Sequence, residues 1–324
     1  MKVLITGGAG FVGSHTVDRL LARGDKVLVI DNFATGRRDN LRPHDALTIV
    51  EGSIADPKLV RDAFDSFRPD VVMHAAAAYK NPDGWEEDVL TNALGSIHVA
   101  RGAVAHKVKR VIYFQTALCY GLNPTQQPIE IDYQRNPEGS SYAFSKTAGE
   151  QYLELSNVNL VSFRLANAYG PRNISGPLPT FYSRLTDGKA CFVMDTRRDF
   201  IYINDLVDVV VRAIDGEGQP GHYHVSSGGD VSIKDLFDAT VEAMNIKLDK
   251  PVEVRPRNPD DAFTILLDPS KTQAQFPGWK TTTALKKGVA DTIAYYRKHG
   301  IAETFTHLRL PGTDAAKHEH AAAH

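Results

Sequence analysis

A glycine-rich turn between a strand-like and a helix-like segment restricts the fold of this chain more than any other feature. The run ITGGAGFVGSHTVDRLL places Gly8, Gly10 and Gly13 in a G-x-G-x-x-G pattern directly after the apolar residues 2–6. Gly7, Gly10 and Gly13 also fit the related G-x-x-G-x-x-G pattern. Such a turn lets backbone N–H groups at the start of a helix receive a pyrophosphate, and a side chain at Gly10 would block that approach. The turn therefore predicts a dinucleotide-binding unit, with a plain glycine-rich turn as the alternative.

Short β-branched runs alternate with helix-like patterns through the first half of the chain. The runs cover residues 2–6, 26–30, 47–50, 70–74, 110–114 and 160–164. Continuous apolar runs are typical of strands buried on both faces, and helices between them favour parallel pairing through right-handed crossovers. We therefore expect an α/β fold with a doubly wound parallel sheet.

The pattern changes after about residue 170, where Pro and Gly cluster in 171–179 and 216–229. We expect a smaller α+β lobe there, while the helix-like segment 205–214 looks like a return to the first domain. The predicted division gives 1–170 and 204–225 to the nucleotide-binding domain, 171–203 and 226–310 to the substrate-binding lobe, and 311–324 to a disordered tail.

Composition excludes several classes of function. The formal net charge is −2 and no Lys/Arg run is present, so a nucleic-acid-binding face is not expected. No apolar run approaches the length of a membrane-spanning helix. Cys119 and Cys191 lack the spacing of a zinc site or a disulfide framework, so we expect two packed thiols, no metal and a cytoplasmic location.

Asp31 indicates which dinucleotide the turn accepts. It ends the second predicted strand, where a carboxylate can accept both ribose hydroxyls but would repel a 2′-phosphate. NAD is therefore favoured over NADP. Arg37 and Arg38 lie nearby and could bind a phosphate, although a surface role is the simpler expectation for both.

The catalytic candidates are Tyr142 and Lys146, which occur in the run SYAFSK. Four residues of separation on a helix place both side chains on one face, one turn apart. A free phenol is a weak base at neutral pH, but a neighbouring ammonium and a positive nicotinamide would lower its pKa. A Tyr/Lys pair on a solvated helix face is the alternative.

Several motifs in order make the chain resemble a known family. The segments TGGAGFVG, DNFATGRRDNL, HAAA, QTALCYG, SYAFSK, RLANAYGPR and RRDFIYIND resemble those of the extended short-chain dehydrogenases/reductases, in the nucleotide-sugar epimerase/dehydratase branch. The resemblance spans residues 1 to about 300 and implies a Rossmann domain. It also implies that Thr116 hydrogen-bonds the reacting sugar hydroxyl beside Tyr142, where a Thr that only caps a loop is the alternative.

The resemblance and the glycine turn together give a set of expected NAD contacts. Most members carry an Asp where this chain has Ser53, so Ser53 and Ile54 are expected at the adenine. The expected contacts are Gly7, Gly10, Phe11, Val12, Gly13, Asp31, Asn32, Gly36, Ser53, Ile54, Ala75, Ala76, Ala77, Asn92, Tyr142 and Lys146.

The substrate contacts implied by the resemblance lie later in the chain. Asn167 and Arg198 match residues that hold the substrate diphosphate, together with Thr116 at the sugar. A further arginine is expected in VRPRNPDD, where Arg257 with Asp260 or Asp261 is favoured and Arg255 competes. Ile265 matches a position that limits the bulk of the sugar at carbon 2.

The residues that follow Thr116 depart from the family pattern, and this departure argues against a dehydratase or decarboxylase. Dehydratase and decarboxylase relatives place acidic residues directly after the position of Thr116, whereas this chain has Ala117, Leu118 and Cys119. Glu130 and Asp132 could supply the acid and base of a dehydratase instead, although two solvent-exposed loop residues are the simpler expectation.

We therefore expect a UDP-sugar 4-epimerase that works through a 4-keto intermediate. The resemblance further implies a homodimer formed by the helix that carries Tyr142 and the helix before it, and a place in bacterial surface-polysaccharide pathways. The alternatives are a nucleotide-sugar or uronate dehydrogenase/reductase with net redox change, a nucleotide-sugar dehydratase, and an NAD-sensing regulator without catalysis.

Overall fold

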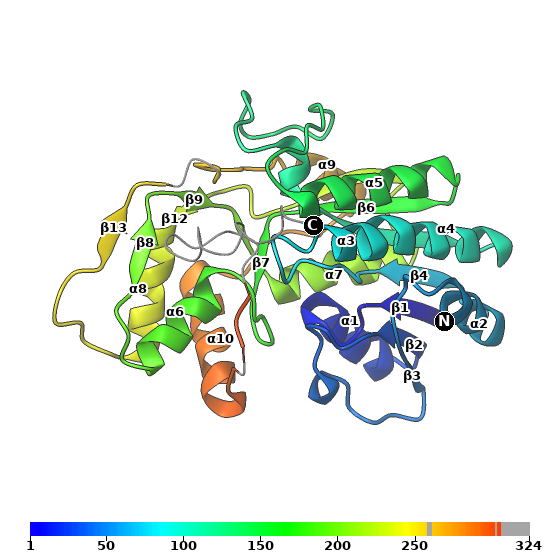
Figure 1. Cartoon of the computed structure of the whole chain (residues 1–324), viewed down its shortest axis with the longest axis horizontal. Coiled ribbons are helices and arrows are strands. Elements are labelled where there is room, and N and C mark those ends of the chain that lie inside the picture. The colour runs from blue at the N-terminus through cyan, green and yellow to red at the C-terminus, as the bar shows by residue number, and fades with distance from the viewer. Residues whose placement is uncertain (258–260, 302, 306–324) are drawn as a thin grey trace, which may run out of the picture.

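A seven-stranded parallel sheet forms the centre of the molecule. The computed structural model describes residues 1–257, 261–301 and 303–305, so the predicted tail at 311–324 lies outside the described residues. The strand order is β11-β6-β5-β4-β1-β2-β3 (Figure 1), and every neighbouring pair is parallel. The strands are β1 (Lys2–Thr6), β2 (Lys26–Asp31), β3 (Leu47–Glu51), β4 (Val71–His74), β5 (Arg110–Thr116), β6 (Leu160–Leu165) and β11 (Gly221–Val225). The predicted fold class is confirmed.

Helices cover both faces of this sheet. On one face Val3 and Ile5 of β1 share a core with Val17 of α1 (Phe11–Ala22), and α7 (Ile203–Ile214) packs against α1. On the other face Leu4 of β1 shares a core with Phe64 of α2 (Pro57–Phe67). The helices α4 (Gly95–Ala105) and α5 (Ser141–Leu155) continue that second layer. Alternate residues of one strand thus pack into two separate cores, as a doubly wound sheet requires.

Two details of the strand prediction were wrong. The run 47–50 was expected to be buried on both faces, but β3 is an edge strand and Ile49 is 43% exposed. The strand β11 was missed because its sequence, GHYHV, alternates polar and apolar residues, and as the opposite edge strand it tolerates that pattern.

A smaller lobe lies beside the sheet domain (Figure 1). Its helices are α6 (Pro177–Thr186), α8 (Ile233–Met244) and α10 (Leu285–His299), and the rings of Phe181 and Phe237 join α6 to α8 at 5.1 Å. Short strand pairs complete it, namely β8 (Phe192–Met194) with β13 (Glu253–Arg255) and β9 (Arg197–Arg198) with β12 (Val231–Ser232). Within the described ranges, no helix combines the length and the hydropathy that a bilayer span requires.

The remaining elements are short segments that connect the two parts or shape the loops. They are η1 (Arg38–Asn40), α3 (Trp85–Asp88), the π-helix η2 (Val89–Leu94), η3 (Ala117–Tyr120), β7 (Asn167–Tyr169), β10 (Phe200–Tyr202) and α9 (Ser270–Gln275).

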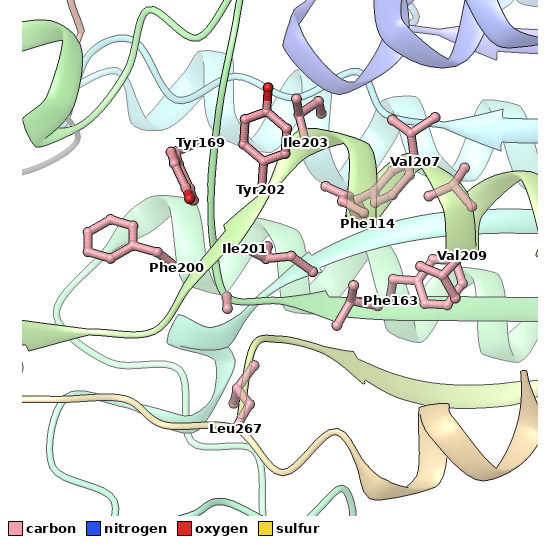
Figure 2. Packing of buried hydrophobic residues seen from close by; sticks show 14 of the residues in the cluster. Phe114, Phe163, Tyr169, Phe200, Ile201, Tyr202, Ile203, Val207, Val209 and Leu267 are labelled. Atoms are coloured by element: carbon pink, nitrogen blue, oxygen red, sulfur yellow. The ribbon is translucent and has the colours of Figure 1, made fainter. Parts of the chain in front are cut away.

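One hydrophobic core joins the sheet domain to the smaller lobe. The strand β10 pairs with β7 and leads directly into α7. Figure 2 shows Tyr169 beside Phe200 and Tyr202, with ring centroids 6.0 and 5.5 Å away. Buried residues of the lobe and of the sheet belong to the same cluster, so the two parts are packed against each other through one core. The predicted domain boundaries themselves stay a prediction.

A glycine allows α5 to approach η2 closely. A Cβ atom at Gly149 would overlap the carbonyl oxygen of Asn92 and lie 2.7 Å from the hydroxyl of Ser96. The position of α5 relative to the sheet therefore depends on the missing side chain.

We predict that Gly149→Ala destabilises the protein, although alanine favours a helix by about 1 kcal/mol. Overlap with backbone costs about 1–3 kcal/mol, because a carbonyl oxygen cannot move as a flexible side chain would. Urea unfolding would measure the change, with Gly229→Ala as the control because a Cβ atom there meets nothing within 4 Å. Equal stability of the two variants would contradict the predicted overlap.

Candidate active site

The glycine turn has the geometry of an anion cradle at the N-terminus of α1. Gly7 has a φ of +71°, and a Cβ atom there would lie 2.6 Å from the backbone nitrogen of Ala76. A Cβ atom at Gly13 would overlap the carbonyl oxygen of Gly7. Gly10 differs, because the nearest atom to its Cβ would be that carbonyl at 3.2 Å, with open cleft beyond. No side chain caps α1, so its first N–H groups remain available to a pyrophosphate.

Asp31 lies at the rim of the same cleft, at the end of β2. Its carboxylate oxygens accept hydrogen bonds from the backbone N–H groups of Ala9 and Phe33, both at 2.8 Å. Burial raises the pKa of Asp31, while these two bonds lower it. Each oxygen retains a lone pair for a ribose hydroxyl. Arg37, also at the rim, is paired with Asp39 at 2.8 Å rather than free for a phosphate.

Ser53 and Ile54, which the sequence predicts at the adenine, both line the cleft, and their contact with adenine stays a prediction. The Ser53 hydroxyl accepts from the Ala55 N–H at 3.1 Å and keeps its own proton to donate. The residues of the expected cofactor set that line the cleft are Gly7, Gly10, Phe11, Val12, Gly13, Asp31, Asn32, Gly36, Ser53, Ile54, Ala75, Ala76, Ala77, Tyr142 and Lys146.

Asn92 is expected to contact the cofactor, but in the structure it lies behind the residues that line the cleft. It is buried, and its side chain accepts from the N–H of Ala78 at 2.8 Å and donates to the carbonyl of Ala78 at 3.0 Å. It also donates to the hydroxyl of Ser145 at 3.0 Å, which lies between the two catalytic candidates on α5. In the described chain Asn92 therefore holds the cleft floor and the catalytic helix together instead of lining the cavity.

A buried histidine with a defined tautomer supports this floor. The Ser96 hydroxyl donates to the carbonyl of Asn92 at 2.6 Å, so it accepts from Nε2–H of His74 at 2.8 Å. The Nδ1 atom of His74 then accepts from the Thr6 hydroxyl at 2.7 Å, and that hydroxyl accepts from the N–H of Ala76 at 3.2 Å. Burial lowers the pKa of His74 to about 3, so the ring is neutral.

Tyr142 and Lys146 occupy the first turns of α5, whose N-cap is Ser140. Both line the cleft, which also contains the glycine turn and the end of β5. The two residues thus lie on one helix face beside the predicted dinucleotide site.

Burial governs the pKa shifts of this pair. The sequence predicts that the ammonium of Lys146 and a positive nicotinamide together lower the pKa of Tyr142; in the protein by itself burial raises that pKa, and Tyr79 and Asp88 raise it further. Burial also lowers the pKa of Lys146 to about 7, against a raising effect of Glu150. Desolvation thus opposes the charged form of both groups, and the lowering of the phenol pKa by Lys146 together with a nicotinamide stays a prediction.

Thr116 ends β5 and lines the cleft near the same pair. Its hydroxyl oxygen accepts from the N–H of Leu118 at 3.1 Å, so it does cap the η3 turn. That bond leaves the hydroxyl proton free to meet a substrate oxygen. The capping role and the catalytic role are therefore compatible.

No acid and base of a dehydratase occupy the loop after Thr116 in the described residues. The Cys119 thiol is buried and its pKa is raised to about 12. Glu130 and Asp132 are exposed and are not among the described residues that line the cleft. Cys191, the second thiol, is half-buried and free.

The predicted substrate residues separate into two groups. Asn167 lines the cleft and donates to the carbonyl of Asp199 at 3.2 Å. Arg198 instead donates to a carboxylate oxygen of Asp261 at 2.6 Å, and Arg257 donates to the carbonyl of Asp261 at 3.0 Å. Neither arginine is among the described residues lining the cleft, so their role at the diphosphate stays a prediction.

Two further substrate candidates lie apart from the described cleft. Arg255 pairs with Glu253 at 2.8 Å on the surface, as expected of a solvated side chain. Ile265 is buried in the core that joins the lobes, and Asp260 lies outside the described residues.

The structure adds cleft residues that the sequence analysis missed. Tyr79 and Lys80 follow β4, where position after a strand of a parallel sheet could have indicated them. Arg172 and the segment 173–178 come from the Pro/Gly cluster that was expected only to mark a boundary. Their approach to the cleft arises from tertiary packing.

A cluster of possible metal ligands lies at the far end of α5. Glu150, Glu154 and His222 offer ligand atoms within 4.8 Å of one another. The guanidinium of Arg135 donates to Glu150 at 2.7 Å and to Glu154 at 3.0 Å, so it already bridges the two carboxylates. This cluster is an ion-pair network in the structure.

Comparison with known proteins assigns the family. The model of the NAD dependent epimerase/dehydratase family matches residues 3–226. The chain belongs to the NAD-dependent epimerase/dehydratase family. The UDP-glucose 4-epimerase of Mycolicibacterium smegmatis is 31% identical over 315 residues, which cover 92% of this chain and 99% of that protein.

Solved structures agree with this assignment. The Bordetella bronchiseptica enzyme WbmH in complex with NAD+ is 54% identical, with a TM-score of 0.90 over 93% of this chain and 99% of that one. The enzyme WbmG of the same organism, in complex with NAD and UDP, is 46% identical, with a TM-score of 0.88 over 95% and 99% of the two chains. The predicted family, the cofactor NAD and the prediction of a carbohydrate epimerase are confirmed.

We predict that Gly10→Val weakens NAD binding at least tenfold (about 1.4 kcal/mol) while changing the free energy of unfolding by less than about 1 kcal/mol. A Cβ atom at Gly10 would meet only the carbonyl oxygen of Gly7, at 3.2 Å, so a shift of a few tenths of an ångström accommodates it, whereas a bound pyrophosphate would block the side chain. Calorimetric titration with NAD and urea unfolding measure the two effects, with Gly229→Ala as the control. Wild-type NAD affinity in Gly10→Val would show that the pyrophosphate does not lie over this turn.

Proposed function

We propose that this chain is an NAD-dependent epimerase that inverts carbon 4 of a UDP-activated sugar through a transient 4-keto intermediate. One arrangement carries the proposal. Helix α5 presents Tyr142 and Lys146 to the cleft that also holds the glycine turn and Thr116 at the end of β5. An acid/base group, a cation and a hydroxyl thus surround the place where a nicotinamide and a sugar would meet.

The chain's own residues supply proton transfer and orientation. Tyr142, as the phenolate, takes the proton of the sugar 4-hydroxyl in the first half of the cycle and returns it in the second. The hydroxyl of Thr116 holds the same sugar oxygen, and the ammonium of Lys146 stabilises the phenolate. Bound NAD supplies the acceptor and donor of a hydride, so the cycle has no net redox change.

Retention of the nucleotide is the second requirement of inversion. We propose that Asn167, which lines the cleft, anchors the diphosphate, with Arg198 and Arg257 as its partners on ligand binding. The sugar can then turn about its diphosphate linkage and present its opposite face. The uridine assignment is supported by the WbmG structure with UDP and by the relative named UDP-glucose 4-epimerase.

Substitution of the proposed base tests the assignment. We predict that Tyr142→Phe lowers the rate of inversion by about 10²–10⁴, because general acid–base catalysis contributes a factor of that size. NAD binding should be retained, since the ring remains. The measurement is chromatography of UDP-glucose and UDP-galactose after incubation without added NAD.

Tyr295→Phe is the matched control, because Tyr295 lies on α10 outside the described cleft lining. Inversion at the wild-type rate by Tyr142→Phe would remove the base assignment. Stoichiometric formation of NADH by the wild-type protein would instead support the dehydrogenase.

We propose that the protein is a homodimer that pairs through α4 and α5. These helices lie side by side (Figure 1) and leave large apolar side chains in solvent, with Leu155 74% and Phe144 56% exposed. Apolar side chains gathered on adjacent helices favour burial against a second copy. We also propose a cytoplasmic location and a role in supplying sugars for surface polysaccharides, and the two free cysteines suit a reducing compartment.

The dimer proposal predicts that Leu155→Glu shifts the protein from dimer to monomer, because the interface would then bury a charge. Light scattering coupled to size-exclusion chromatography measures the mass. Val254→Glu, an exposed position on β13 in the other lobe, should leave the dimer intact. A monomeric wild-type protein would contradict the proposal.

A further inference from the structure

The ammonium of Lys146 lies over an aromatic ring that no motif indicates. Its Nζ atom is 4.0 Å from the ring centroid of Tyr113, which lies on β5 and is fully buried. The hydroxyl of Tyr113 donates to the backbone carbonyl of Lys146 at 2.8 Å. One residue therefore contacts both the charged end and the backbone of the lysine.

The other groups around Lys146 give its charge little support. Among the described residues, no carboxylate lies within ion-pair distance of the ammonium, and Glu150 is paired with Arg135 at 2.7 Å and Arg164 at 3.2 Å. The ring of His74 lies 5.4 Å from that of Tyr113, and burial lowers the pKa of His74 to about 3, so it is neutral. The titratable groups near Lys146 on α5 are Tyr142 and Glu150. Those on the elements around it include Tyr113 on β5, His74 on β4, Cys119 and Tyr120 on η3, Glu86, Glu87 and Asp88 on α3, His98 on α4 and Arg164 on β6.

We propose that Tyr113 is a positioning residue whose aromatic face keeps Lys146 charged beside Tyr142. The negative face of an aromatic ring attracts a cation, and the attraction is strongest where water is excluded. Lys146 is 2% exposed, so this contact acts in such a place. The hydroxyl of Tyr113 has a separate task, which is to fix the backbone of α5.

The sign of the effect follows from burial. Burial lowers the pKa of Lys146, and the ring opposes this by stabilising the charged form. The charged form is present below this pKa and is lost as the pH rises through it. Weakening the ring's attraction should therefore move the titration of Lys146, and the alkaline limit of turnover, to lower pH.

The test separates the ring's electrostatics from its shape. Tyr113→Phe removes the hydroxyl and keeps the electron-rich face, whereas pentafluorophenylalanine at position 113 keeps nearly the same shape and reverses the charge distribution of the face. Both variants lose the same hydrogen bond to Lys146, so each is the control of the other. Partly fluorinated phenylalanines extend the pair to a graded series if the pentafluoro variant does not fold.

The primary readout is the titration of the Lys146 side chain by NMR in protein with ¹³C-labelled lysine, assigned with Lys146→Met. We expect the phenylalanine variant to titrate within a few tenths of a pH unit of wild type, and the pentafluoro variant about one unit lower. The alkaline limit of inversion should shift in the same direction. Because this inference rests on the proposed function only for that second readout, the NMR result stands if the protein proves not to be an epimerase. Equal midpoints across the fluorinated series would overturn the proposal.

Discussion

The position of Tyr142 and Lys146 at the carboxyl edge of the parallel sheet is the constraint on which the site depends. Lys146 is 2% exposed and Tyr142 is half-buried. Desolvation raises the pKa of the phenol and lowers that of the ammonium to about 7, so it disfavours the charged form of each group. The proposed cycle needs the phenolate of Tyr142 beside the ammonium of Lys146. A positive nicotinamide would favour the phenolate but oppose the ammonium, so the site also needs contacts that support the charge of Lys146.

The rest of the structure maintains this burial through close backbone approach. Gly7 lets the turn before α1 lie against the backbone that follows β4, Gly13 lets α1 lie against that turn, and Gly149 lets α5 lie against η2. Between these contacts the neutral His74, Ser96 and the buried Asn92 carry hydrogen bonds from β1 to the first turns of α5. The residues that form the floor of the cleft and the helix α5 are therefore parts of one packed unit, and a shift in either would move the other.

Much of this could be predicted from the sequence because the relevant signals are local. A glycine turn between strand and helix, Asp31 at a strand end and Tyr142 four residues before Lys146 are short patterns with direct physical meaning. The edge strand β11 and the exposure of β3 were missed, because the position of a strand in the sheet is a tertiary property. Arg172 and the ring of Tyr113 were missed for the same reason, whereas Tyr79 follows a predicted strand and could have been indicated by that position. The pKa of Tyr142 depends on burial that no spacing encodes.

The most direct test of the account is the fate of the hydrogen at carbon 4 of the sugar. A UDP-sugar with deuterium at that carbon would be incubated with the enzyme in ordinary water, and the inverted product analysed by mass spectrometry and NMR. The account predicts that the deuterium remains on carbon 4, because hydride transfer to and from bound NAD never exposes it to solvent. Replacement of the deuterium by solvent hydrogen would show that carbon 4 is inverted by deprotonation and would contradict the assigned role of Tyr142.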